Sequence, residues 1–200
     1  MIVQRRIAPT VLLLVSVACT SGTERASADS VAARPSAASD SSAAPSTTPP
    51  TMTATDSTVT EHGLGALRVG MTFAEAKQAL AGALAMSLES STGCDYATWH
   101  GGPRGVHVMV DEGRIARVEI DSVGIATAAG ARVGDTEERI RSLYPGRVTV
   151  TPHKYEDGHY LTVNAADDSS FAIVFETSKG RVTRYRAGRR PAVELVEGCS

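Results

Sequence analysis

Histidine, cysteine and serine side chains are the candidates for catalytic or metal-binding chemistry in this 200-residue sequence. Of the five histidines, only His153 and His159 flank a short polar turn, where they could meet across a hairpin. Zinc needs further ligands close by, so we interpret this pair as solvated turn residues. No serine stands in a G-x-S-x-G motif, and the acidic pairs at 111–112 and 167–168 fall in predicted turns, where acidic residues are common. The sequence therefore predicts no catalytic residue, no metal and no cofactor.

The first residues contain the parts of a secretory signal peptide. Arg5 and Arg6 precede an apolar stretch from Ile7 to Ala18. A helix over this stretch rises about 18 Å, well short of the roughly 30 Å hydrocarbon core, so it is too short for a comfortable membrane span. Pro9 and the polar composition that follows argue against the alternative, a buried helix of a cytosolic domain. We expect residues 1–18 to be a signal peptide that directs export.

The segment Ser16-Val17-Ala18-Cys19 resembles the bacterial lipobox, in which a cysteine follows a small residue at the end of the apolar core. In that family the chain is cut before the cysteine and the thiol is acylated, for example with palmitate. The resemblance implies that Cys19 anchors a lipoprotein in the outer membrane of a bacterial cell envelope, where it faces the periplasm. The alternative is ordinary cleavage after Ala18, which would give a soluble periplasmic or secreted protein.

Residues 19–61 are predicted to form a disordered tether behind the lipidated cysteine. They are rich in Ser, Thr, Ala, Pro and Asp and contain no aromatic residue. Such a segment cannot bury enough apolar area to offset its conformational entropy. A flexible chain of this length reaches roughly 35 Å.

The remaining residues, 62–200, are enough for one globular domain with its own core. Removal of residues 1–18 takes away Arg5 and Arg6 and changes the formal charge from −2 to −4. A weakly acidic total does not favour nucleic acid as a partner.

Two cysteines, Cys94 and Cys199, remain once Cys19 is assigned to lipid. An even number of cysteines in an oxidising compartment indicates a disulfide. A metal site would need more soft ligands, and a redox pair usually has the close spacing of C-x-x-C. We predict that Cys94 and Cys199 form a structural disulfide. Closing a loop of about a hundred residues stabilises the fold by about 4–5 kcal/mol in the chain-entropy model.

Internal similarity is the most informative feature of the globular part. Residues 67–72, Leu-Arg-Val-Gly-Met-Thr, match residues 131–136, Ala-Arg-Val-Gly-Asp-Thr, 64 positions later. Residues 111–115, Asp-Glu-Gly-Arg-Ile, match residues 178–182, Ser-Lys-Gly-Arg-Val, 67 positions later. The shared order of the two matches predicts a duplicated unit. We expect repeat one at about 64–123, repeat two at about 124–190 and a C-terminal tail at 191–200.

Each repeat is predicted to begin with a helix and to continue with strands. Thr72 and Glu75 form a capping box before a helix from Phe73 to about Ala85, and Asp135 with Glu138 provides the equivalent start. Alternating apolar residues predict strands at 96–100, 106–110, 115–120, 148–151, 160–165, 171–176 and 181–187. This order predicts an α+β fold: two tandem helix-plus-antiparallel-sheet repeats that form one compact domain, with the helices on one sheet face.

The segment Val69-Gly70-Met71-Thr72 opens a predicted helix ahead of a strand meander with a Gly turn. In this respect residues 64–187 resemble small bacterial envelope modules. These are the SmpA/OmlA-type outer-membrane assembly lipoproteins and, in tandem, the β-lactamase-inhibitor protein fold. The resemblance implies a non-catalytic protein that binds other proteins through an exposed sheet face.

Basic and aromatic side chains are the candidates for a binding surface. Arg184 and Arg186 share a strand face within a basic group that could meet an acidic protein or anionic lipid headgroups. The alternative is a solvated edge that discourages strand pairing. Aromatic residues anchor many interfaces, with core packing as the alternative. The candidates are Arg181, Arg184, Arg186, Arg189 and Arg190, with the aromatic residues Trp99, Tyr155, Tyr160 and Tyr185.

These observations predict a non-enzymatic envelope lipoprotein that binds a protein or assists envelope assembly. The expected partners are the membrane, through the lipid, and an envelope protein. The alternatives are a periplasmic protein that binds a small ligand, lipid or peptidoglycan, and a periplasmic enzyme of unrecognised type.

Overall fold

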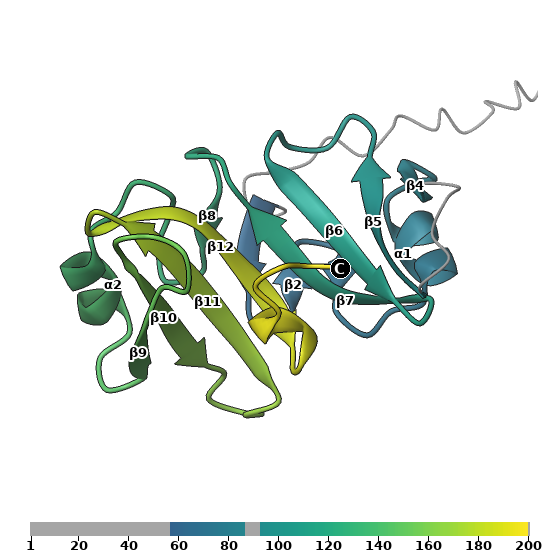
Figure 1. Ribbon diagram of the computed structural model, residues 1–200. Helices are drawn as coiled ribbons and strands as arrows, with labels where there is room; N and C mark the ends of the chain where they lie inside the picture. Colours follow the sequence, from purple (N-terminus) through teal and green to yellow (C-terminus); the bar gives the residue numbers. More distant parts are fainter. Residues whose placement is uncertain (1–56, 87–92, 200) are drawn as a thin grey trace, which may run out of the picture. The chain divides into compact units, whose positions relative to one another are not determined.

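The computed structural model describes residues 57–86 and 93–199 of the chain (Figure 1). The predicted signal peptide, Cys19 and most of the predicted tether lie outside these residues. Within the two described ranges, no helix is long and apolar enough to cross a membrane.

An eight-stranded antiparallel sheet dominates the described residues (Figure 1). Most of its strands coincide with the predicted ones to within one or two residues. In spatial order they are β4 (Leu84–Met86), β5 (Cys94–Trp99), β6 (Val106–Asp111), β7 (Arg114–Ile120), β12 (Arg181–Arg189), β11 (Phe171–Ser178), β10 (His159–Asn164) and β9 (Val148–Pro152).

A second sheet of four short strands, in the order β3, β2, β1 and β8, was not predicted. Its strands are β3 (Leu67–Arg68), β2 (Gly63–Leu64), β1 (Thr58–Thr60) and β8 (Ala126–Thr127). Strand β1 pairs in parallel with β8 and buries Val59 completely. Residues 57–61, which the sequence places in the predicted tether, therefore contribute a strand to the described fold, because a single valine in a polar segment gives no recognisable strand pattern.

Two helices of seven residues each, α1 (Phe73–Ala79) and α2 (Glu137–Leu143), precede the two groups of strands. The capping box of α1 is confirmed, since the Thr72 hydroxyl accepts a bond from the Glu75 N–H and the Glu75 carboxylate accepts one from the Thr72 N–H. Helix α1 ends six residues earlier than expected, where Gly82 takes a positive φ of 85° and the chain turns into β4.

The predicted start of α2 is displaced by one residue. Thr136, not Asp135, caps the helix, and its hydroxyl accepts a bond from the Arg139 N–H. The Asp135 carboxylate instead accepts from the backbone N–H of Arg132 in the preceding turn. Both residue types are good caps, so the sequence alone did not separate them.

The matching sequence segments occupy equivalent local positions. Gly70 N–H donates to Ile115 O at 2.8 Å, and Gly134 N–H donates to Val182 O at 2.8 Å. Each bond ties the residues before a helix to the strand that follows a hairpin turn. In each of the two turns, a non-glycine residue and the glycine after it have positive φ. They are Glu112 and Gly113 in the first turn and Lys179 and Gly180 in the second.

The prediction of an α+β fold with two tandem helix-plus-sheet repeats is nevertheless wrong. The described part is mostly β-strand, and its α-helices are two short segments of seven residues each. Strand β7 pairs with β12 in the register Ile120 with Tyr185 and Arg117 with Gly188, so both groups of strands form one continuous sheet. Sequence patterns report which residues form strands but not which distant strands become neighbours.

One face of the large sheet carries the main hydrophobic core. Apolar side chains of this face pack against α1, α2 and the small sheet. They alternate with residues of the opposite face, so that Leu161 and Phe175 are fully buried in this core while their chain neighbours point away. Residues of this core include Val59, Leu64, Ala76, Val108, Ile120, Ile140, Val163, Ile173, Tyr185 and Ala187.

Candidate binding groove on the second face of the sheet

The C-terminal residues 190–199, here called the strap, lie on the second face of the large sheet. The strap contains the 3-10 helix η2 (Ala192–Glu194), which contacts β12, β11 and β7. Its end is joined to the start of β5 by the Cys94–Cys199 disulfide, with a Cα–Cα distance of 5.4 Å. The predicted disulfide is therefore confirmed, and it fixes the strap across the sheet.

Two buried arginines also hold the strap. Arg117 on β7 donates through Nη1 to the carbonyl oxygens of Ala192 at 2.5 Å and Leu195 at 2.6 Å. Arg186 on β12 donates through Nε to the carbonyl oxygen of Val193 at 2.5 Å. Main-chain carbonyls of an irregular segment need such donors when they are buried. The arginines thus replace the ladder partners that a strand would have supplied.

The chain provides room for Arg117 through a glycine on the neighbouring strand. A Cβ atom at Gly188 would lie 2.5 Å from the Cβ of Arg117, closer than carbon atoms approach without a bond. Any larger residue at position 188 would displace the arginine from β12 and from the strap.

Each buried guanidinium has a carboxylate partner. Arg117 donates to Glu119 through Nε at 2.9 Å and through Nη2 at 2.7 Å. The Tyr96 hydroxyl donates to the same carboxylate, and burial together with this bond raises the pKa of Tyr96, so the phenol stays neutral. On β12, Arg186 pairs with Glu176 of β11. Burial lowers the pKa of Arg186, and the carboxylate of Glu176 opposes that effect.

The hairpin between β9 and β10 holds the other side of the strap. Lys154 Nζ lies 2.8 Å from Glu197 Oε1, and the Tyr155 hydroxyl donates to the same oxygen. The hydrogen bond with Glu197 raises the pKa of Lys154, and the bond from Lys154 lowers the pKa of Glu197. The His153 ring stacks on Tyr160 with centroids 4.4 Å apart. The strap is thus fixed at both borders.

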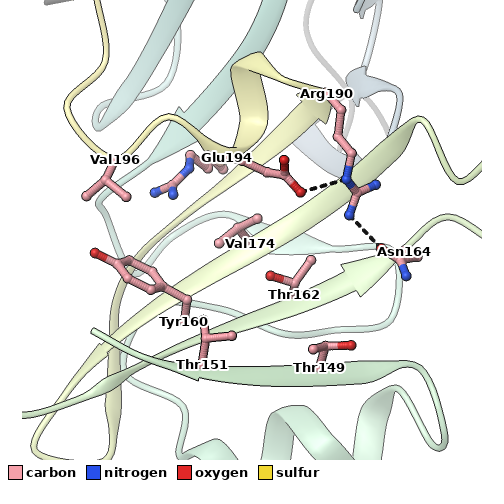
Figure 2. A pocket seen from close by; sticks show the side chains of 10 residues that line it. Thr149, Thr151, Tyr160, Thr162, Asn164, Val174, Arg190, Glu194 and Val196 are labelled. Atoms are coloured by element: carbon pink, nitrogen blue, oxygen red, sulfur yellow. Dashed lines mark hydrogen bonds and ion pairs between the residues drawn. The ribbon is translucent and has the colours of Figure 1, made fainter. Parts of the chain in front are cut away.

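Beside the strap, the second face of the sheet is hollowed into a groove of 340 Å³ (Figure 2). Strands β9 to β12 form its floor, and Glu194 and Val196 of the strap form a wall. The remaining lining residues are Thr149, Thr151, Tyr160, Thr162, Asn164, Val174, Arg186 and Arg190. A second hollow of 260 Å³ shares Glu194 and Val196 and lies along the strap beside Lys154 and Leu195.

The charges that line the groove are compensated. Arg190 donates through Nε to Glu194 Oε1 at 2.7 Å and through Nη2 to Asn164 Oδ1 at 2.7 Å (Figure 2). Arg186 is paired with Glu176, as described above. The lining side chains of β9 and β10 are hydroxyl and amide groups, from Thr149, Thr151, Tyr160, Thr162 and Asn164. Hydroxyl and amide groups can bond to neutral hydrogen-bonding partners.

The predicted basic group does not form one free cationic surface. Arg184 and Arg186 share a strand face as expected, but both reach the single carboxylate of Glu176, and Arg186 is only 3% exposed. Arg190 is engaged in the groove wall, Arg181 donates to the carbonyl oxygen of Gly134, and Arg189 lies over the Phe171 ring. The pairing with Glu176 depends on side-chain contacts across the β11–β12 hairpin, which the strand pattern alone does not specify.

The aromatic candidates separate into core and surface residues. Tyr185 is fully buried, and its hydroxyl donates to the carbonyl oxygen of Ile125 at 3.1 Å. Trp99 packs partly buried against the main core, and Tyr160 is 8% exposed beneath the strap. Tyr155 is 61% exposed and stands beside the strap, so it is the most exposed of the four.

His153 and His159 do not share a site. His153 Nε2 lies 3.6 Å from Glu176, whereas His159 Nδ1 lies 2.8 Å from Glu137 at the start of α2. No group of three or more potential metal-ligating side chains occurs within residues 57–86 and 93–199. The groove residues Thr149, Thr151 and Thr162 were not recognised from the sequence. The alternation Val-Thr-Val-Thr at 148–151 was the available signal, because it places hydroxyl groups on one face of a strand.

The sequence matches no protein-family model and no curated protein. The structure is similar to the uncharacterized protein YfeY from Escherichia coli, with 16% identity and a TM-score of 0.44 over 66% of this chain and 99% of that one. It is also similar to the DUF4309 family protein YjgB from Bacillus subtilis, with 11% identity and a TM-score of 0.43 over 68% of this chain and 88% of that one.

A third similar structure is an extracellular protein containing a SCP domain from Bacillus anthracis, with 9% identity and a TM-score of 0.41. The match covers 72% of this chain and 49% of that protein, so this chain spans about half of its length.

Proposed function

We propose that this chain is a non-catalytic protein-binding module of the bacterial cell envelope, anchored through a lipid on Cys19. The groove on the second face of the eight-stranded sheet is the observation that supports the proposal. Its strap wall is held by a disulfide, two buried arginines and the β9–β10 hairpin. A surface fixed in this way loses little conformational entropy when a partner binds.

The shape and chemistry of the groove support a macromolecular partner. Strand β9 is the last strand of the sheet, so no further strand borders the groove on that side among the described residues. An open-sided groove fits a segment of a larger molecule better than a small ligand, which pockets usually enclose. Arg186 and Arg190 are already paired with carboxylates, so they offer no free positive charge to an anionic lipid headgroup.

Site-specific photo-crosslinking tests this function in the cell envelope of the host. A benzophenone amino acid at Thr149 or Thr151, both exposed in the groove, should give a discrete adduct with a protein. The same amino acid at Val123, which is 69% exposed and does not line the groove, serves as the control. Equal adducts from position 123, or none from the groove positions, would contradict the proposal.

The lipid anchor is tested separately with Cys19. Metabolic labelling with an alkyne analogue of palmitate should mark the wild-type chain and place it in the membrane fraction. A Cys19→Ser variant should lose the label and leave that fraction. A variant that remains membrane-bound with its mass changed only by the oxygen-for-sulfur substitution would disprove lipidation.

A further inference from the structure

No strand of the described residues, 57–86 and 93–199, pairs with the outer edge of β9. Proteins usually protect edges with short strands, charged residues, prolines or bulges. At the opposite end of the sheet, β4 has only three residues. Strand β9 has five residues, carries no charge, and pairs with β10 without a register shift. Its single proline is the final residue, Pro152.

The hydrogen-bond pattern of the hairpin identifies which main-chain groups face outward. His153 N–H donates to Gly158 O at 3.0 Å, so this pair is hydrogen-bonded. In an antiparallel ladder the bonded and non-bonded pairs alternate along the strand. Val148 and Val150 therefore belong to non-bonded pairs with β10, and their N–H and C=O groups point to the open side. Pro152 falls on the same side, where it lacks an N–H.

The two faces of β9 differ in the side chains that an added strand would meet. Val148 and Val150 pack against the main core, whereas Thr149 and Thr151 line the groove (Figure 2). Opposed threonines and β-branched residues pair favourably across strands. Because the arginines of the groove are already paired, a charged side chain on an added strand would find no free counter-charge there.

We propose that β9 accepts an extended segment of another polypeptide by strand addition. The segment bonds to the main-chain groups of Val148 and Val150 and directs small, uncharged side chains toward Thr149 and Thr151. This inference rests on the proposed protein-binding function and specifies its mode. Main-chain bonds supply affinity in such complexes, and the alternate side chains supply specificity.

A second copy of this chain is a poorer occupant of the same edge. Five strand residues span about 17 Å. Pairing of two such edges alone buries far less than the roughly 1,200–2,000 Å² of a standard stable interface. An extended segment of another protein gains the same main-chain bonds and also fills the groove, which two opposed β9 edges do not do.

Peptide selection provides the test. Full-length protein carrying Cys19→Ser is used to select binders from a phage-displayed library of random dodecapeptides. We expect enrichment of uncharged, β-branched sequences, with affinities then measured on synthetic peptides. N-methylation of the selected peptide should weaken binding at least tenfold at every second residue and less than threefold at the residues between, because only one edge of the peptide faces β9.

Variants of Val150 separate the main chain from the side chain. Val150→Pro removes an outward N–H without removing a bond to β10 and should weaken peptide binding at least tenfold. Val150→Ala truncates the side chain but keeps the N–H, so binding should stay within about threefold. Circular dichroism and thermal unfolding of both variants establish that they fold. Equal binding by Val150→Pro and wild type, or an N-methyl scan without a period of two, would overturn strand addition.

The remaining outcomes distinguish the inference from the proposed function. If the groove crosslinks persist in Val150→Pro, the proposed protein-binding function stands and strand addition is overturned. Absence of groove crosslinks in the wild type would overturn both. Failure to enrich any peptide, or a dimer in analytical ultracentrifugation that Val150→Pro abolishes, would also overturn the proposal, the latter in favour of self-association.

Discussion

The two faces of the eight-stranded sheet are stabilised by different interactions. On the core face, residues such as Leu161 and Phe175 are fully buried among other apolar side chains. On the second face, Arg117 and Arg186 are almost as deeply buried, but each pairs with a carboxylate and donates to the main chain of the strap, Arg117 to two carbonyl oxygens and Arg186 to one. Burial of apolar area is non-directional, whereas buried charges require specific partners in fixed positions.

This difference explains why the groove lies where it does. A face that gains its stability from close-packed apolar side chains must be covered completely. The second face is held by directional bonds, one disulfide and a small apolar cluster of Tyr160, Ala172, Val174 and Val193, so part of it can remain open as the groove without exposing the main core. The comparison predicts that stability depends mainly on the first face and binding on the second.

The largest expected effect comes from neighbouring residues of β10 that point to opposite faces. Leu161→Ala should lower the free energy of unfolding by about 3–4 kcal/mol, because it leaves a cavity in the main core. Thr162→Ala, on the groove face, should change it by less than about 0.5 kcal/mol. Urea unfolding of both variants measures the difference. Similar losses would mean that the two faces contribute alike to stability.

Loss of the disulfide should have the next largest effect. The double variant Cys94→Ser, Cys199→Ser frees the end of the strap, and we expect a loss of about 3 kcal/mol, because measured losses are commonly smaller than the value of the chain-entropy model. The far-UV spectrum should remain that of a folded β protein, because the core face is unaffected. Hydrogen exchange should increase in residues 190–199 more than in β7. Global unfolding of the variant at 25 °C would show that the strap is required for the whole sheet.

Arg117→Met tests the polar network directly. The variant removes the guanidinium that donates to the carbonyl oxygens of Ala192 and Leu195 and leaves the Glu119 carboxylate without its cationic partner. Unsatisfied buried acceptors should cost about 2 kcal/mol in urea unfolding. Arg139→Met, which removes an exposed partner of Asp135, is the matched control and should cost less than about 0.5 kcal/mol. A neutral Arg117→Met would indicate that the strap carbonyls are satisfied by water.

The smallest expected effect on the free energy of unfolding concerns the carboxylate of Glu137, at the start of α2. Burial alone would raise the pKa of Glu137, but hydrogen bonds from Thr177 and His159 outweigh it, and the pKa is lowered below its ordinary value of 4.5. Its contribution to stability is therefore complete above the unfolded-state pKa and is lost as the pH falls through the lower folded-state pKa.

Glu137→Gln should accordingly destabilise the protein by about 1 kcal/mol at pH 7, and this difference from wild type should shrink by pH 3. Urea unfolding at the two pH values measures it. A difference that stays constant or grows toward pH 3 would be inconsistent with a lowered pKa.

Local features of this protein were predictable because they depend on residues close in the chain. The capping box of Thr72 and Glu75, the hairpin turns at 112–113 and 179–180, and the strands around Val108 and Ile173 all follow from short-range patterns. The Cys94–Cys199 pairing followed from a count, because the prediction of a lipid on Cys19 left two cysteines to be paired.

Long-range features were decided by the tertiary structure alone. The pairing of β7 with β12 joins residues 65 to 71 positions apart in the chain, from Ile120 with Tyr185 to Arg117 with Gly188, and it joins the two expected repeats into one sheet. The same pairing places Gly188 beside Arg117, which becomes a support for the strap, and the strap in turn covers Arg186. A residue's type and spacing determine its local conformation, but its burial and partners depend on which distant strands lie beside it. For that reason the arginines looked like a surface group in the sequence and are, in part, the buried support of the groove.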